Sequence, residues 1–138
     1  PFDPVVTSVN FLQIGIGYEH LNLELNHRNW FTQSDNNNNS YMALDIIQDW
    51  AGSNSGKNII KKSEVFNFNI TLGNEIGIKH LSLLPYINYQ VYGGDIDFSS
   101  LSYGISLSFF FSDEFIELGV SDGDKTMMSY YLSFGSYF

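Results

Sequence analysis

The stretch that decides the fold is the last one, Met128-Ser-Tyr-Tyr-Leu-Ser-Phe-Gly-Ser-Tyr-Phe138. Counting back from the end, every second position is mostly large and apolar: Phe138, Ser136, Phe134, Leu132, Tyr130 and Met128. The positions between them are mostly small or polar: Tyr137, Gly135, Ser133, Tyr131 and Ser129. A period of two predicts a strand with two unlike faces. Such a strand without charges would promote aggregation in water, whereas in a membrane barrel one face contacts acyl chains and the other lines a polar lumen.

This ending resembles the C-terminal signature of bacterial outer-membrane β-barrel proteins. In that class a final phenylalanine follows aromatic or aliphatic residues at alternate positions, and the assembly machinery reads this strand. The resemblance rests on Tyr130, Leu132, Phe134 and Phe138, and Ser136 departs from it. It implies a bacterial outer-membrane location, contact with membrane lipids and lipopolysaccharide, and an assembly signal in the final strand. It says almost nothing about activity.

Composition supports a membrane barrel. With 138 residues the chain accommodates one domain spanning 1–138. Charged residues make up 15% and aromatic residues 17%, against roughly 25% charged residues in ordinary soluble domains. No run approaches the roughly 18 uninterrupted apolar residues that a transmembrane helix needs. Low charge combined with short alternating segments therefore favours strands that cross a bilayer.

Several classes of function are disfavoured by the sequence. The net charge of −9 would repel nucleic acid, and the absence of cysteine excludes disulfides and thiol chemistry. The Gly15-x-Gly17 pair is followed neither by a helix pattern nor by Lys-Ser/Thr, so it does not predict a phosphate loop. No cofactor and no metal centre is predicted. No signal peptide is visible, and we interpret Pro1 as a mature or trimmed start.

The alternation predicts an all-β fold, a transmembrane antiparallel up-and-down β-barrel of eight strands. Each strand would have roughly the nine to eleven residues that cross a bilayer at a tilt. The alternation from which the strands are inferred runs through residues 9–18, 21–28, 41–50, 65–73, 83–92, 101–111, 116–121 and 128–138. A tight hairpin is expected near 19–21, a loop at 32–40 and a turn at 74–80. Both termini would then lie on the periplasmic side.

One predicted strand is ambiguous. Within residues 41–50, Met42, Leu44 and Ile46 alternate as on a strand, but Leu44, Ile47 and Trp50 also fit a helical stripe. We favour the strand. If residues 32–62 were instead one outer loop, seven strands would remain, and the chain would be the C-terminal part of a larger porin-type barrel.

The residue types on the two faces of the strands indicate whether the outside of the barrel contacts lipid or water. A soluble lipocalin-like barrel would have a large apolar interior and an exterior carrying lysine and glutamate. In residues 101–111 six apolar side chains alternate with serine and glycine, and burying them would contribute about 12 kcal/mol in total. A second face of Ser, Gly, Asn and Thr suits the narrow lumen of an eight-stranded barrel. Aromatic girdles are expected from Tyr18, Trp30, Tyr41, Trp50, Tyr92, Tyr103 and Tyr130.

Three charged residues are predicted to form a network in the lumen. Arg28 is the only arginine, and the strand phase places it inside with Glu24 and with Glu117 of another strand. It could serve as a gate or as an ion-pathway charge. We favour a paired structural charge that plugs a narrow barrel, because an unpaired buried charge is very costly.

Four aspartates on two outer loops form a second candidate site. Asp95 and Asp97, with Asp122 and Asp124, could gather a divalent cation, since hard cations prefer carboxylate oxygens. Asp-x-Asp pairs are also ordinary turn residues, and we favour that interpretation.

His20, His27 and His80 are the candidates for acid–base catalysis. No local Ser/His signature accompanies them, so an enzyme is not the preferred interpretation. We predict a small integral membrane barrel with a structural role, or with outer loops that bind a protein partner. The alternatives are a lipid-modifying enzyme embedded in the outer leaflet and the C-terminal part of a larger porin-type channel. A histidine near a serine or aspartate at one membrane rim would favour the enzyme, and a continuous lumen would favour the channel.

Overall fold

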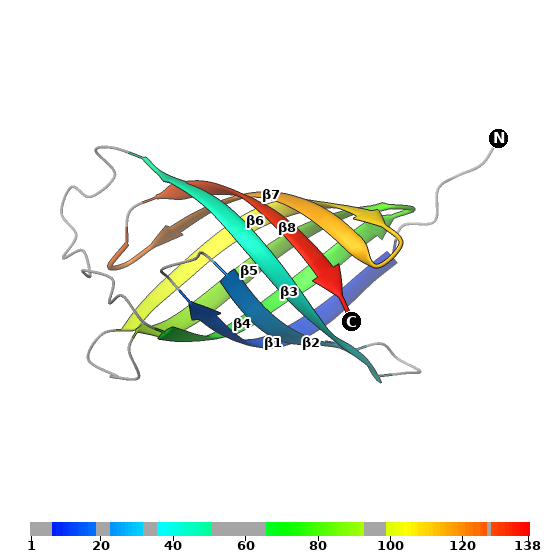
Figure 1. The fold of residues 1–138 in the computed structure, drawn as a ribbon, viewed down its shortest axis with the longest axis horizontal. Coiled ribbons are helices and arrows are strands. Elements are labelled where there is room, and N and C mark those ends of the chain that lie inside the picture. The colour runs from blue at the N-terminus through cyan, green and yellow to red at the C-terminus, as the bar shows by residue number, and fades with distance from the viewer. Residues whose placement is uncertain (1–6, 19–22, 32–35, 51–65, 93–98, 127) are drawn as a thin grey trace.

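The described part of the chain forms a closed barrel of eight antiparallel strands (Figure 1). The computed structural model describes residues 7–18, 23–31, 36–50, 66–92, 99–126 and 128–138. The strands are β1 (Thr7–Tyr18), β2 (Leu23–Phe31), β3 (Asn36–Asp49), β4 (Phe66–Ile78), β5 (Leu81–Tyr92), β6 (Ser99–Phe111), β7 (Glu114–Gly123) and β8 (Ser129–Tyr137). The described residues contain no helix that is long and apolar enough to cross a membrane. The predicted all-β class, strand number and closure are confirmed.

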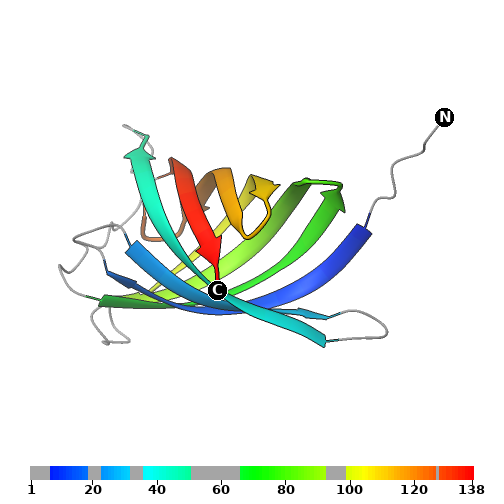
Figure 2. The same cartoon turned by 45° about the vertical axis from the view of Figure 1, so that its right-hand side comes forward.

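The order of the strands around the barrel is not sequential. The wall reads β1-β2-β3-β8-β7-β6-β5-β4 and closes through the pairing of β1 with β4. Neighbouring strands run alternately up and down, as predicted, but β8 pairs with β3 and not with β1 (Figures 1 and 2). The first four strands therefore have the spatial order 4-1-2-3 of a Greek key. The connection from Asp49 to Phe66 has to bridge two strands that β1 and β2 separate.

The ambiguous segment 41–50 lies almost entirely within strand β3. Met42 and Ile46 face outward and are exposed, whereas Tyr41 and Ala43, on either side of Met42, are buried. The strand pairs with both β2 and β8, so the seven-strand count is wrong.

Two strands are longer than the sequence indicated. Asn36–Asn39 continue the β2–β3 ladder opposite Arg28–Phe31, although this asparagine run was predicted to be a loop. Likewise β4 extends to Ile78 through residues that were predicted to turn. In both cases backbone pairing with a neighbouring strand outweighs the weak strand propensity of asparagine and glycine.

One end of the barrel has two tight turns, and we call it the terminal end because Thr7 and Phe138 also lie there (Figure 1). The pairs Ile78↔Leu81 and Phe111↔Glu114 leave only two residues in each turn. The first residue of each turn has positive φ, 55° at Lys79 and 59° at Ser112, as two-residue hairpins require. The longer connections 19–22, 50–65 and 93–98 join strands at the opposite end, which we call the loop end. The first and last described residues therefore share one side, as predicted for the two termini.

The two faces of the wall have the predicted contents. Ile46 and Ile87 on the outer face are 58% and 55% exposed, whereas Asn26 and Ser108 on the inner face are 1% and 2% exposed. The outward apolar side chains come from all eight strands: Ile14, Ile16, Leu25, Met42, Leu44, Ile46, Phe68, Ile70, Leu72, Leu83, Ile87, Leu101, Ile105, Leu118, Val120, Tyr130 and Phe134. We call this surface the apolar belt.

The predicted aromatic girdle is only partly correct. Trp50, Tyr103 and Tyr130 are exposed, but Tyr41 and Tyr92 are each 3% exposed and point into the lumen. The phase of their strands decides this, because Tyr41 precedes the outward Met42 of β3 and Tyr92 follows Val91, which shares the outward face of Ile87 and Tyr89 in β5.

Candidate functional site: the barrel interior and its rim

Aromatic side chains close the lumen at the terminal end. Phe115 packs edge-on against Tyr41, with ring centroids 5.1 Å apart, and lies 5.3 Å from the ring of Tyr137. Phe110 completes the cluster, which we call the aromatic plug. The plug depends on Gly135, because a Cβ there would lie 2.1 Å from Cζ of Phe115. Only a glycine lets the ring approach the wall this closely.

Arg28 lies within this plug and is 6% exposed. Its guanidinium carbon lies 4.5 Å from the centroid of Phe11, 5.8 Å from that of Trp30 and 5.5 Å from that of Tyr41. Such placement over ring faces is a favourable cation–π arrangement.

The guanidinium is also paired and hydrogen-bonded. Nη1 of Arg28 lies 3.3 Å from Oε1 of Glu75, and Nε donates to Oε1 of Gln13 at 2.8 Å. The hydroxyl of Tyr41 donates to the same Gln13 oxygen at 3.0 Å and accepts from Nη2 of Arg28 at 3.5 Å. The buried cation is thus held by an anion, an amide and a phenol, which is the arrangement that a structural charge needs.

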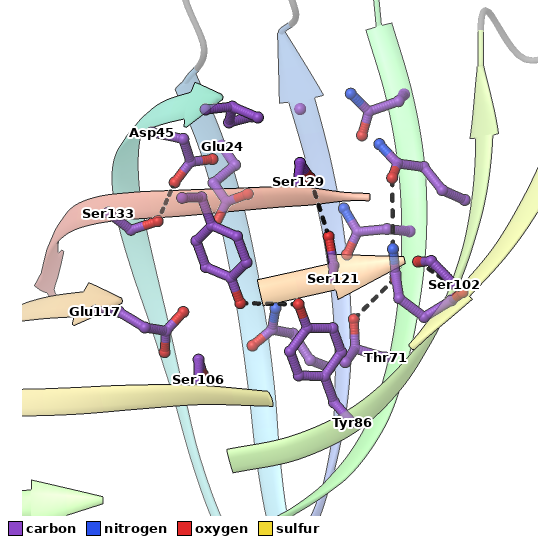
Figure 3. Close-up of a pocket in the computed structure, with 18 of the residues that line it drawn as sticks. Glu24, Asp45, Thr71, Tyr86, Ser102, Ser106, Glu117, Ser121, Ser129 and Ser133 are labelled. Atoms are coloured by element: carbon purple, nitrogen blue, oxygen red, sulfur yellow. Dashed lines mark hydrogen bonds between the residues drawn. The ribbon is translucent and has the colours of Figure 1, made fainter. Parts of the chain in front are cut away.

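The three predicted lumen charges all face inward, but they are not one tight network. The acid beside Arg28 is Glu75, which sequence reasoning missed because residues 74–80 were predicted to turn. Glu117 accepts a hydrogen bond from Oγ of Ser108 at 3.1 Å. Glu24 lies next to Asp45, a second acid that the sequence reasoning did not single out (Figure 3). The parity of β3 is the signal that could have found Asp45, since it shares the inward face of Tyr41.

Between the aromatic plug and the loop end lies a polar cavity of about 320 Å³. Its wall is formed largely by serine, asparagine and tyrosine side chains (Figure 3). The hydroxyls of Tyr86 and Tyr131, from β5 and β8, meet at 2.8 Å. Thr71 donates to Oδ1 of Asn88 at 3.0 Å. The lumen therefore narrows from a polar chamber to an aromatic end.

The cavity carries an excess of acid. Glu24, Asp45, Asp49 and Glu117 line it, and Arg28 is the only cationic side chain among the described lining residues. Such a chamber favours cations and protons and repels anions. The described residues contain no group of three or more acidic or histidine side chains that could hold a metal ion.

Two of the four loop aspartates can be placed. Oδ1 of Asp124 accepts from Oγ of Ser100 and from the Leu101 N–H, each at 3.0 Å. Asp122 accepts from the Tyr103 hydroxyl at 3.4 Å and from the Gly123 N–H at 2.9 Å. The contacts of Asp124, which follows β7, are ordinary turn chemistry. Asp122 was predicted to begin that turn, but it lies within β7 and contacts its cross-strand partner Tyr103. Asp95 and Asp97 lie outside the described residues, so shared cation binding by all four stays a prediction.

One histidine has a serine partner. Nδ1 of His27 lies 2.8 Å from Oγ of Ser40, with both side chains on the outer face of the β2–β3 pair. His80 is in the exposed turn after β4, and His20 lies outside the described residues. Ser40 comes 13 positions after His27 in the sequence, so only the β2–β3 register could have predicted the contact.

Comparison with protein-family models, with curated proteins and with solved structures gives no match.

Proposed function

We propose that this chain is a small integral outer-membrane β-barrel protein whose lumen does not conduct. The observation that carries the proposal is the apolar belt, which runs over all eight strands while the interior is polar. Lipid-embedded barrels have this distribution, with an apolar band outside and polar residues inside. The aromatic final strand, with Phe134 and Phe138 outward and exposed, adds support from its resemblance to outer-membrane proteins.

A water-soluble monomer would be hard to reconcile with such a belt. Soluble monomers rarely expose a contiguous apolar patch larger than a few hundred Å². Here neighbouring outward residues pair across adjacent strands, for example Leu72 with Ile87 and Leu118 with Leu132. Acyl chains of membrane lipids and lipopolysaccharide are the surroundings that this surface fits.

In the proposed orientation the terminal end faces the periplasm and the loop end faces outward. The aromatic plug with its paired arginine then closes the periplasmic end of the lumen. Because the eight described strands close on themselves, a role as one sector of a wider channel has no support in the pairing. We therefore propose a structural role, with the loop end as the surface that meets a protein partner.

Insertion of the wild-type protein tests the proposal. The urea-unfolded chain, diluted into phosphatidylcholine vesicles, should gain β-structure by circular dichroism and become resistant to protease. Without lipid or detergent it should aggregate, because the belt would face water. A monomer that folds fully in buffer and ignores vesicles would contradict the proposal.

The plug predicts the absence of conductance. Purified protein in planar bilayers should give no steady current, since an eight-stranded barrel is only wide enough for its own side chains, and here Arg28, Tyr41 and Phe115 fill the terminal end. A sixteen-stranded porin serves as the positive control. Reproducible channel steps from the purified chain would favour the channel alternative.

Deleting Phe138 should separate folding from assembly. Its ring is 72% exposed, so deletion costs at most about 1.5–3 kcal/mol of burial in lipid, and folding into detergent should stay nearly intact. If the assembly machinery reads the final aromatic residue, outer-membrane levels in cells should fall several-fold. Phe111→Ala, which removes another exposed ring at the terminal end but outside the final strand, is the matched control. Equal cellular levels of the deletion, the control and the wild type would remove the assembly signal from the proposal.

A further inference from the structure

The outer wall carries a nucleophile beside a base. His27 of β2 and Ser40 of β3 are directly paired across the two strands, and Nδ1 lies 2.8 Å from Oγ. Hydrogen-bond contact between a hydroxyl and an imidazole is the arrangement that activates a serine for attack. We propose that His27 and Ser40 form a catalytic pair that hydrolyses acyl esters of membrane lipids at the terminal rim of the barrel.

The position of the pair indicates the substrate. On the loop-end side of the pair the next outward residues are Leu25 and Met42, each 46% exposed and part of the apolar belt. On the other side the next outward residues are Asn29 and Asn38. The pair thus lies where the apolar surface gives way to a polar one. In a bilayer the ester groups of glycerolipids occupy this zone, between the hydrocarbon core and the headgroups.

The backbone holds Ser40 firmly at this border. Its N–H donates to Oδ1 of Asn39 at 2.9 Å, and its carbonyl accepts from the Phe138 N–H at 3.0 Å. Phe138 is therefore the cross-strand neighbour of Ser40, and its ring is exposed. Sites built on paired strands position side chains more accurately than sites on loops.

The chemistry follows from the contact. With the ring proton on Nε2, Nδ1 of His27 accepts the Ser40 hydroxyl proton while Oγ attacks the ester carbonyl carbon. The ester C–O bond breaks, and the imidazolium returns the proton to the leaving alcohol. Water, deprotonated by the same imidazole, then attacks the acyl-serine. This step frees the carboxylic acid and regenerates the hydroxyl, so the balance is ester plus water to acid plus alcohol.

Among the described residues, no carboxylate accepts a hydrogen bond from Nε2 of His27. In a catalytic triad such a carboxylate orients the histidine, so the pair lacks this third member. We therefore expect slow turnover. The decisive test measures covalent labelling of the serine nucleophile and does not depend on the rate of hydrolysis. The full chain, folded in detergent micelles, is treated with a fluorophosphonate probe and digested for mass spectrometry. The probe should attach to Ser40, and attachment should be lost in Ser40→Ala.

The role of the base is tested with matched variants. His27→Gln should slow labelling by roughly 10²–10⁴-fold, the usual contribution of a general base. His80→Gln and Ser136→Ala change another exposed histidine and an exposed serine near the same rim, and both should label at the wild-type rate. Circular dichroism and protease resistance of each variant show that it is folded. Equal labelling of wild type and His27→Gln, or labelling elsewhere than Ser40, would overturn the pair.

The lipid substrate is tested separately, because that part of the inference rests on the proposed membrane location. Wild-type protein inserted into phosphatidylcholine vesicles should release fatty acid, and Ser40→Ala should not. Labelling of Ser40 in micelles without fatty-acid release from vesicles would overturn the lipid substrate and leave the catalytic pair standing. Failure of the chain to insert at all would overturn the proposed function, while the soluble probe would still report on the pair.

Discussion

Lysine at position 87 should prevent stable insertion of the barrel, whereas lysine at position 88 should be tolerated. Ile87 is 55% exposed on the outer face of β5, between Leu72 and Tyr103 of the adjacent strands. A lysine facing lipid near the bilayer midplane costs about 2–4 kcal/mol. Because each 1.4 kcal/mol is a factor of ten, the ratio of folded to unfolded protein should fall by roughly 30- to 1000-fold.

The control comes from the next residue of the same strand. Asn88 faces inward and lines the polar cavity, where it accepts a hydrogen bond from Thr71 at 3.0 Å. Asn88→Lys should lose that hydrogen bond, about 1 kcal/mol, and gain attraction from the acidic cavity wall. Urea titrations in the presence of lipid vesicles compare the two variants. Equal losses of folding free energy would contradict the assignment of the two faces to lipid and lumen.

The two faces could be predicted because side-chain alternation is a local property of a strand. In β6 the outward Leu101, Tyr103 and Ile105 alternate with inward Ser102 and Gly104, and no knowledge of neighbours is needed to see this. The same parity placed Arg28, Glu24 and Glu117 inside.

The order of the strands could not be predicted from that signal. Alternation says which face a side chain occupies and does not say which strand lies beside it. The connection from Asp49 to Phe66 makes the first four strands a Greek key and not a simple meander. Side-chain contacts that depend on this strand order could therefore not be predicted. Glu75, for example, reaches Arg28 because β4 joins the wall next to β1.

The ends of the strands and the contacts between side chains of neighbouring strands also could not be predicted from the sequence. Asn36–Asn39 read as a loop because asparagine has low strand propensity, yet pairing with β2 extends the ladder through them. The contact between His27 and Ser40 exists only in the β2–β3 register. A local motif search could not have found it, since Ser40 comes 13 positions after His27 in the sequence.

Removing the guanidinium of Arg28 should be the most destabilising change in the lumen. Arg28→Met leaves the Glu75 carboxylate without its cation and deprives Gln13 of a charged donor. Breaking a buried ion pair by removing one partner typically costs 3–5 kcal/mol. The Glu75 side chain is 20% exposed, so a loss of about 3 kcal/mol is expected in urea unfolding from detergent micelles.

The double variant decides what kind of charge Arg28 is. If the arginine is a structural charge, Arg28→Met with Glu75→Gln should recover much of the loss, because no charge is then left unpaired in the plug. If it is a gate, Arg28→Met should unfold at nearly the wild-type urea concentration and give currents in planar bilayers that the wild type lacks. The aromatic plug favours the first outcome, since Phe11 and Tyr41 would still close the lumen around a methionine. A stable, conducting Arg28→Met variant would contradict both the pairing argument and the proposal of a closed barrel.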